Sequence, residues 1–213
     1  MAIDHLLYEH VQSERVRGWL RANGAGLIGG VILGLGLIGG WQWWQQHQAN
    51  QRAEAGRQYD AIVRTVAQKD LKKAKAEVAA LADSGTDYAA LAAMHVAKAQ
   101  LDGGDRDGAI ATLRAVQAKD PAIDTVVRSR LARLLNDAGK PKDALALLGD
   151  KPEGAAAIEA RGDALFALGR VEEARKAYAQ AMAKLDVATP QRRLVELKLI
   201  QVGGNPARPE VRG

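Results

Sequence analysis

The sequence contains no cysteine and few aromatic or proline residues. With no cysteine among its 213 residues, the chain cannot form disulfides, use a thiol nucleophile or bind a metal through thiolates. One Phe, four Tyr, four Trp and six Pro leave alanine and leucine to supply much of the apolar content. Because these two residues lose least on entering a helix, the composition predicts an all-α fold.

A strong excess of one charge is also missing. The 30 basic and 25 acidic residues give a net charge of +5, which is a small surplus on a mixed surface. No Lys/Arg cluster alternates with aromatic residues, as it does in proteins that follow a nucleic-acid strand. We therefore expect no nucleic-acid partner.

Charged residues are absent between Arg21 and Arg52, and residues 24–44 are almost wholly apolar or glycine. As a helix this stretch would cover roughly 30 Å, the thickness of the hydrocarbon core of a bilayer. Indole side chains lie at both of its ends, where they suit the two membrane interfaces. These indoles belong to Trp19, Trp41, Trp43 and Trp44. The stretch therefore predicts one transmembrane helix.

Two other interpretations of residues 24–44 are weaker. A cleaved signal peptide has a shorter apolar core with a small-residue cleavage site close behind it, whereas the nearest Ala-x-Ala pattern here is Ala53–Ala55. A buried helix of a soluble protein is rarely uncharged on every face for six turns.

The flanks of this stretch predict its orientation. Arg15, Arg17 and Arg21 crowd its N-terminal side, while Arg52 is the first basic residue on the other side apart from His47. Basic residues are enriched on the cytoplasmic side of membrane helices. We therefore expect a membrane protein with a cytoplasmic N-terminus and an exported C-terminal part.

Gly26, Gly30 and Gly34 are spaced four residues apart and so lie on one side of the predicted span. Small residues at this spacing let membrane helices approach closely. The pattern predicts helix packing against another membrane protein or a second copy. The alternative is that glycine is simply common in membrane helices.

The remainder of the chain is repetitive. Four stretches share a short signature that ends in alanine, and these alanines are 35, 35 and 30 residues apart. The stretches are 69–74, 104–109, 139–144 and 169–174. This period is typical of a helix-turn-helix repeat.

The residues around each signature suit stacked pairs of helices. The position twelve residues before each alanine is small in the last three units, and the position four residues after it is large. The positions before the alanines are Ile62, Ala97, Ala132 and Gly162. The positions after them are Val78, Leu113, Leu148 and Tyr178. Glycine at the turn ends the first helix, although the first unit has Lys69 there and residues 149–154 shorten the third.

A last helix is expected to begin at Thr189-Pro190, a cap residue followed by proline at the first helical position. We expect it to bury Leu194, Val195 and Leu197 and to end before a flexible tail at residues 203–213.

The repeats resemble the tetratricopeptide repeat family, most clearly in residues 162–169, followed by Glu173-Ala174, Tyr178 and Ala181. In such stacks the first helix of each pair lines the concave face. The alignment predicts a partner-binding face of mixed polarity, which suits a polypeptide ligand. Its candidate residues are Lys98, Asp102, Arg133, Asn136, Asp163 and Phe166.

No catalytic, cofactor-binding or metal-binding residue is predicted. His5 with Glu9, and His10 with Glu14, have the spacing of a helical metal pair but no further ligand nearby. Two G-x-G-x-x-G strings, starting at Gly24 and Gly34, occur inside the uncharged stretch with no strand before them. We therefore expect a protein that is not an enzyme.

The order of these parts is similar to the YfgM family of bacterial membrane proteins. The matching residues are 22–24, 29–34, 39–41 and 47–48. The resemblance implies an ancillary subunit of the SecYEG translocon, with its repeat domain in the periplasm beside the membrane-anchored chaperone PpiD. On this interpretation the repeats hold a chaperone or an exported polypeptide near the channel exit.

The predicted segments are therefore a cytoplasmic tail at 1–23, a transmembrane helix at 24–44, a periplasmic repeat domain at 45–202 and the tail at 203–213. Two other functions stay open. The chain could be a signalling adaptor whose residues 1–23 sequester a regulator, or an envelope-assembly scaffold with unrelated partners.

Overall fold

Nine helices make up the regular secondary structure of residues 3–206, the part of the chain that the computed structural model describes. Within the first helix, side-chain positions are described for residues 19, 21, 23, 25, 26 and from 29 onward. The helices are α1 (Ile3–Ala67), α2 (Leu71–Ala82), α3 (Tyr88–Asp102), α4 (Arg106–Arg114), α5 (Pro121–Asp137), α6 (Pro141–Leu148), α7 (Ala155–Ala167), α8 (Val171–Ala183) and α9 (Pro190–Gln201). The predicted all-α fold is confirmed.

The chain divides into two compact units, Met1–Arg52 and Ala53–Gly213, and the division falls within α1. The first unit contains the uncharged stretch predicted at residues 24–44. Within this stretch, residues 24, 27 and 28 are not among those whose side-chain positions are described. Among the described residues, none of the helices is both long enough and apolar enough to cross a membrane. The segment boundaries drawn from the sequence stay predictions.

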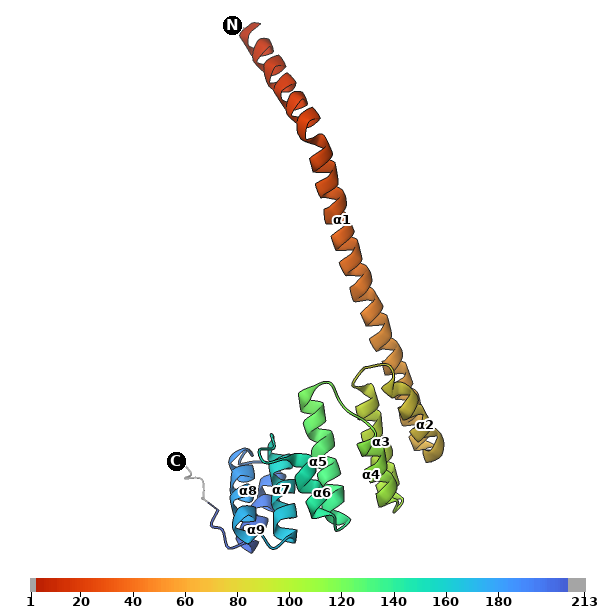
Figure 1. Cartoon of the computed structure of the whole chain (residues 1–213), viewed down its shortest axis with the longest axis vertical. Coiled ribbons are helices and arrows are strands. Elements are labelled where there is room, and N and C mark those ends of the chain that lie inside the picture. The colour runs from red at the N-terminus through yellow and green to blue at the C-terminus, as the bar shows by residue number, and fades with distance from the viewer. Residues whose placement is uncertain (1–2, 207–213) are drawn as a thin grey trace. The chain divides into compact units, whose positions relative to one another are not determined.

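The second unit is a stack of helix pairs. Residues 53–67 of α1 share a core with α2, and α3 with α4, α5 with α6 and α7 with α8 form three further pairs. Helix α9 packs on α8, and helices that follow one another in the chain lie side by side (Figure 1). The predicted helical-repeat solenoid is confirmed.

The repeat signature marks the core of this stack. The four signature alanines are fully buried, and so are the positions twelve residues before and four residues after them. The alanines are Ala74, Ala109, Ala144 and Ala174. Gly162 shows why one position must be small, because a Cβ there would lie 2.5 Å from the ring of Tyr178. The alternation of small and large residues therefore sets the distance between paired helices.

The turns inside the pairs have a left-handed residue after the first helix. Gly104, Gly139 and Gly169 take φ values of +83°, +70° and +75°. The first pair has Lys69 at this position, with φ +63°, and it is the one non-glycine residue with positive φ in the described chain. The turn geometry is therefore kept even where the sequence lacks glycine, at a conformational cost.

Helix α6 is short, as the sequence predicts. It has eight residues and ends at Leu148. The loop that follows runs from Gly149 to Gly154, and both of these glycines take positive φ.

Helix α9 begins at Pro190 with Thr189 as its N-cap residue, as predicted. The expectation that it buries Leu194 and Leu197 is wrong, because these side chains are 50% and 60% exposed. Helix α9 packs mainly on α8 and is tied to α7 by Gln191 and Lys198, so its opposite face is left uncovered. The covered face carries Val195 and Leu199, which are buried at a spacing of four residues.

Candidate protein-interaction site

Helices α5, α7 and α9, at the end of the solenoid, line an open hollow of about 790 Å³. Its lining combines cationic, anionic and amide side chains with three apolar residues. The lining residues are Arg133, Asn136, Asp137, Glu159, Asp163, Ala167, Pro190, Gln191, Leu194 and Lys198. Three of the six residues that the sequence predicts for a partner-binding face therefore come together here.

The carboxylate of Glu159 joins the three helices around the hollow. Glu159 is 2% exposed. Its Oε2 accepts hydrogen bonds from Arg133 of α5 at 2.9 Å and from Gln191 of α9 at 2.8 Å, and its Oε1 accepts one from Lys198 of α9 at 2.8 Å. A buried carboxylate needs such donors, because an unpaired charge in the interior is strongly destabilising.

Asp163 extends this network one turn further along α7. The Tyr178 hydroxyl donates to Asp163 at 2.9 Å, and Lys198 Nζ lies 2.8 Å from the same carboxylate. Lys198 therefore bridges two carboxylates of α7 and holds α9 at a fixed distance from it. We call Arg133, Glu159, Asp163, Gln191 and Lys198 the polar network.

Ionisation in the polar network follows from burial and pairing. Burial raises the pKa of Glu159, but hydrogen bonds from Lys198 and Gln191 and the charges of Lys198 and Arg133 outweigh it and leave this pKa below its ordinary value. Burial lowers the pKa of Lys198, but Asp163 and Glu159 outweigh it and raise this pKa. Burial and the neighbouring Asp163 both raise the pKa of Tyr178. Glu159 and Lys198 are therefore both charged at neutral pH, and Tyr178 stays a hydrogen-bond donor.

Asn136 is placed by a contact between helices. Its side-chain Nδ2 donates to the Ala160 carbonyl of α7 at 2.9 Å. Together with the bond from Arg133 to Glu159, this contact ties α5 to α7 along the floor of the hollow. These two contacts within the protein hold α5 against α7 beside the hollow.

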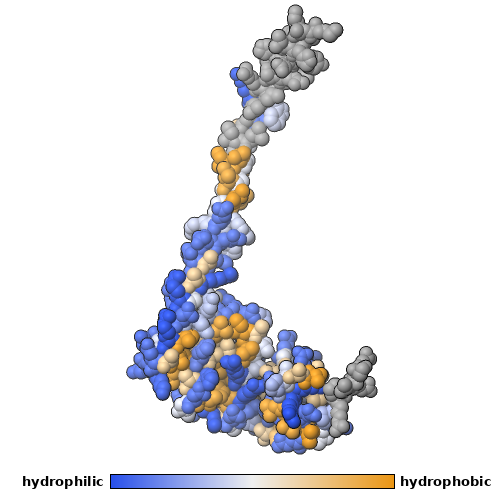
Figure 2. Space-filling model, turned by 180° about the vertical axis from the view of Figure 1, so that it is seen from behind, coloured by the Kyte–Doolittle hydropathy of each residue, from blue (hydrophilic) through white to orange (hydrophobic). Residues whose placement is uncertain are grey.

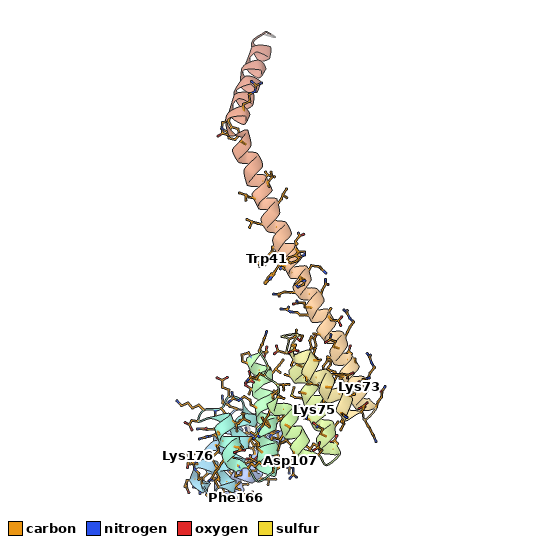
Figure 3. The ribbon with its side chains drawn as sticks, turned by 45° about the vertical axis from the view of Figure 1, so that its right-hand side comes forward. Trp41, Lys73, Lys75, Asp107, Phe166 and Lys176 are labelled. Atoms are coloured by element: carbon orange, nitrogen blue, oxygen red, sulfur yellow. The ribbon has the colours of Figure 1, made fainter. Side chains whose placement is uncertain are left out.

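The other three predicted residues lie outside the hollow. Lys98 and Asp102 belong to α3 and pair with each other across one helical turn at 2.6 Å, with both side chains exposed. Phe166 of α7, labelled in Figure 3, is partly exposed and does not line the hollow. The partner-binding role of all six residues stays a prediction.

Three residues of the polar network are not among the residues predicted for the binding face: Glu159, Gln191 and Lys198. Glu159 is an isolated acid in the alanine-rich helix α7, four residues before Asp163. This spacing puts both carboxylates on one helix face, which is a signal that could have identified the pair. Gln191 and Lys198 belong to α9, which the sequence analysis treats only as a cap.

Gly26, Gly30 and Gly34, which are predicted to pack against another helix, have no such neighbour among the described residues. A Cβ built at Gly26, Gly30 or Gly34 would meet nothing within 4 Å. The described residues therefore leave room for a second helix beside this face of α1, and the packing role stays a prediction. The histidine pairs at residues 5 to 14 lie outside the described side chains.

Aromatic side chains surround α1 just after the glycine-rich stretch. The rings of Trp41 and Trp44 are 5.4 Å apart, and on another side of the helix Trp43 stacks on His47 at 5.5 Å. Figure 3 shows Trp41 projecting from the helix. All three indoles are exposed within this chain.

Comparison with known proteins agrees with the helix pairs. The model of the tetratricopeptide repeat-like domain matches residues 17–204. The ancillary SecYEG translocon subunit of Haemophilus influenzae is 34% identical over 179 residues, which cover 81% of this chain and 88% of the relative. The chain belongs to the family of ancillary SecYEG translocon subunits, YfgM.

Two further members show how far this family resemblance extends. The Escherichia coli ancillary SecYEG translocon subunit is 32% identical and covers 90% of this chain and 95% of its own length. The Aggregatibacter actinomycetemcomitans ancillary SecYEG translocon subunit is 26% identical, and the match covers 92% of this chain and 98% of that relative. The resemblance therefore includes the N-terminal unit as well as the repeats.

Solved structures with similar helices are more distant. Two crystal structures of a Podosopora anserina putative kinesin light chain with nearly identical TPR-like repeats, one of them of a single-residue variant, are 18% identical to this chain. Each covers 68% of this chain and 83% of its own length, with TM-scores of 0.48 and 0.46. The fold assignment rests on the helices themselves and on the matched domain model.

Proposed function

We propose that this chain is a membrane-anchored interaction subunit that associates with the SecYEG translocon and holds a polypeptide partner in the hollow beside α7. The names of its relatives support the translocon association. The hollow, with its polar network, is the observation that carries the binding role. We propose no catalytic activity, since the charged groups of the network are engaged in pairs that hold helices together.

Membrane anchoring is supported by the apolar side chains of α1. Leu33, Leu35 and Leu37 are 70%, 64% and 76% exposed within this chain, and Val31, Ile32 and Ile38 are exposed as well. Successive helical residues are about 100° apart, so these side chains point to every side of the helix. Figure 2 shows hydrophobic atoms along this stretch. Exposed apolar surface of this extent marks a protein or membrane contact.

We propose that residues 24–44 cross the inner membrane, with the indoles after Gly40 in the interface. The arginines at 15, 17 and 21 favour a cytoplasmic N-terminus, so the repeats would lie in the periplasm. A periplasmic chaperone of the PpiD type and exported polypeptides are the partners that this location offers. Gly26, Gly30 and Gly34 would contact a helix of the translocon or the chaperone.

The hollow suits a polypeptide because of its mixed lining. Arg133 has one of its five N–H donors engaged by Glu159 within the described residues, so donors remain for a ligand. Ala167, Pro190 and Leu194 supply apolar surface for side chains. A groove with a few placed polar groups and an apolar wall is typical of binding sites.

Co-purification tests this proposal. Tagged full-length protein is isolated from membranes in mild detergent, bound proteins are identified by mass spectrometry, and a chain lacking residues 1–44 is compared. Recovery of SecYEG subunits and a periplasmic chaperone, both lost on truncation, is expected. Recovery of regulators or unrelated envelope proteins in their place would contradict the translocon assignment.

A variant that fills the hollow tests the binding site separately. Ala167→Trp adds bulk to the lining without removing a hydrogen bond, and Ala179→Trp is the matched control because Ala179 is also exposed but lies on α8 outside the lining. We expect Ala167→Trp to keep SecYEG subunits and to lose most of the chaperone or exported polypeptide. Equal recovery with both variants would place the binding site elsewhere.

A further inference from the structure

Helix α9 has two apolar faces, and the protein covers only one of them. Val195 and Leu199 are 0% and 2% exposed against α8. Leu194, Leu197 and Ile200 are 50%, 60% and 51% exposed on the opposite side. We call these three exposed residues the α9 strip. The same helix therefore presents a second set of large aliphatic side chains to solvent.

This arrangement differs from the other helix pairs. In α7, Leu165 is buried because α8 follows and packs against α7. Helix α9 is followed by Gly203, which takes φ +75°, and by Gly204 and Pro206. These residues end the helix. No described helix follows to cover the α9 strip.

The spacing of the α9 strip suits a helical partner. Residues three apart on a helix form a ridge that fits the groove of a second helix. From Leu194 to Ile200 the ridge is roughly 9 Å long, so it matches about two turns of a partner. An extended strand would need free backbone N–H and C=O groups to pair with, and α9 uses its own in the helix.

A stable pair of identical copies needs more surface than the α9 strip provides. Standard interfaces bury roughly 800 Å² on each partner, and three half-exposed side chains fall well short of this. Leu194, however, also lines the hollow. A partner helix that passes over Leu194 would gain contacts in the hollow as well.

Charge beside the α9 strip indicates the polar side of the partner. Arg193 is exposed, lies four residues before Leu197 and seven before Ile200, and makes no salt bridge with the described residues. It therefore lies on the same face as the strip. A carboxylate on the partner helix would neutralise it.

We infer that Leu194, Leu197 and Ile200 form a docking strip for a short amphipathic helix of a partner protein, with an acidic residue of that helix facing Arg193. This surface goes beyond the proposed function, because Leu197 and Ile200 lie outside the hollow and the strip shares only Leu194 with it.

Site-specific photo-crosslinking tests the α9 strip in the full chain in its own membranes. A benzoyl-phenylalanine replaces Leu197 in one protein and Val187 in a control, since Val187 is 65% exposed in the loop before α9. Crosslinked peptides are identified by mass spectrometry. We expect an adduct from position 197 alone, and its peptide should have apolar residues three or four apart and a carboxylate between them.

Substitutions beside the probe distinguish this contact from chance encounters. Leu194→Gln with Ile200→Gln should lower the adduct yield roughly tenfold or more, because two apolar contacts are lost, and Arg193→Glu should also lower it. Circular dichroism should show unchanged helix content, since these side chains are exposed. An adduct between two copies of this chain, adducts spread over many unrelated segments, or equal yield from position 187 would overturn the inference.

Discussion

Leucine, isoleucine and valine have opposite surroundings in the two compact units. In the repeats, Leu165 and Val195 are 1% and 0% exposed, whereas in the first unit Leu37 and Ile38 are 76% and 56% exposed. Both sets lie on regular helices, so the backbone does not explain the difference. The repeat side chains are covered by neighbouring helices of the same chain. We propose that the lipid bilayer covers those of α1, because they point to every side of the helix.

The largest expected effect on stability comes from comparing an arginine substitution in the repeats with one in α1. Leu165→Arg places an unpaired charge in the core of the repeats and should destabilise them by about 4 kcal/mol or more. Leu35→Arg changes an exposed position and should leave the unfolding of the repeats within about 0.5 kcal/mol of the parent. Thermal unfolding of both full-length variants in mild detergent, followed by circular dichroism, measures this. Equal losses would mean that the two units unfold as one.

A second comparison uses glycines on two helices of the repeats. Gly162→Ala should destabilise the fold by up to about 3 kcal/mol, because its Cβ would lie 2.5 Å from the buried Tyr178 ring. Gly56→Ala is the matched control, since its Cβ would make an ordinary 3.6 Å contact with Tyr88, and alanine favours the helix by up to about 1 kcal/mol. Urea unfolding reports both. A destabilised Gly56→Ala would show that helix propensity does not decide the outcome there.

A third, smaller effect concerns pH and the polar network. The pKa of Glu159 is lowered in the folded protein, so its ionised form stabilises the fold above the ordinary carboxylate range, and this contribution is lost as the pH falls through the folded pKa. Glu159→Gln should cost about 1–2 kcal/mol at neutral pH. The difference from the parent should shrink in acid.

Glu172→Gln is the control for this pH dependence. Glu172 pairs with Arg175 at 2.9 Å, but its side chain is 72% exposed, so its removal should change the stability by well under about 1 kcal/mol. Urea unfolding at a series of pH values compares the three proteins. Parallel curves for the parent and Glu159→Gln would contradict an ionised Glu159.

The smallest effect is expected at the left-handed turns. Lys69→Gly should stabilise the first pair by up to about 1 kcal/mol, because glycine adopts positive φ without the strain that Lys69 bears. Gly169→Lys at the equivalent turn should have the opposite sign. Thermal unfolding checks both. The same sign for the two substitutions would mean that side-chain contacts, rather than φ, decide stability at these turns.

The helix pairs could be predicted because their signals are local and repeated. Ala174, Gly162 and Tyr178 lie within one helix pair, and their spacing recurs along the chain with the same physical reason each time. The period therefore identified the turns and the buried alanines, and the Thr189-Pro190 pair identified the start of α9. Both could do so without knowledge of any contact between distant residues.

The polar network could not be predicted in this way. Glu159 draws its donors from Arg133, Gln191 and Lys198, which are 26, 32 and 39 residues away, and no short motif records such contacts. The exposure of Leu194 and Leu197 was missed for a related reason. An apolar pattern shows that a face can be buried, but whether a neighbour covers it depends on the end of the stack.

Alkaline carbonate extraction of membranes tests the central claim most directly. Full-length protein and a variant lacking residues 24–44 are extracted in parallel, and both are detected in pellet and supernatant. A bilayer-embedded α1 predicts that the full chain stays in the pellet while the deletion variant is released. Release of the full chain to the same extent as the deletion variant would contradict the account, because the exposed apolar residues of α1 would then need a protein cover instead of lipid.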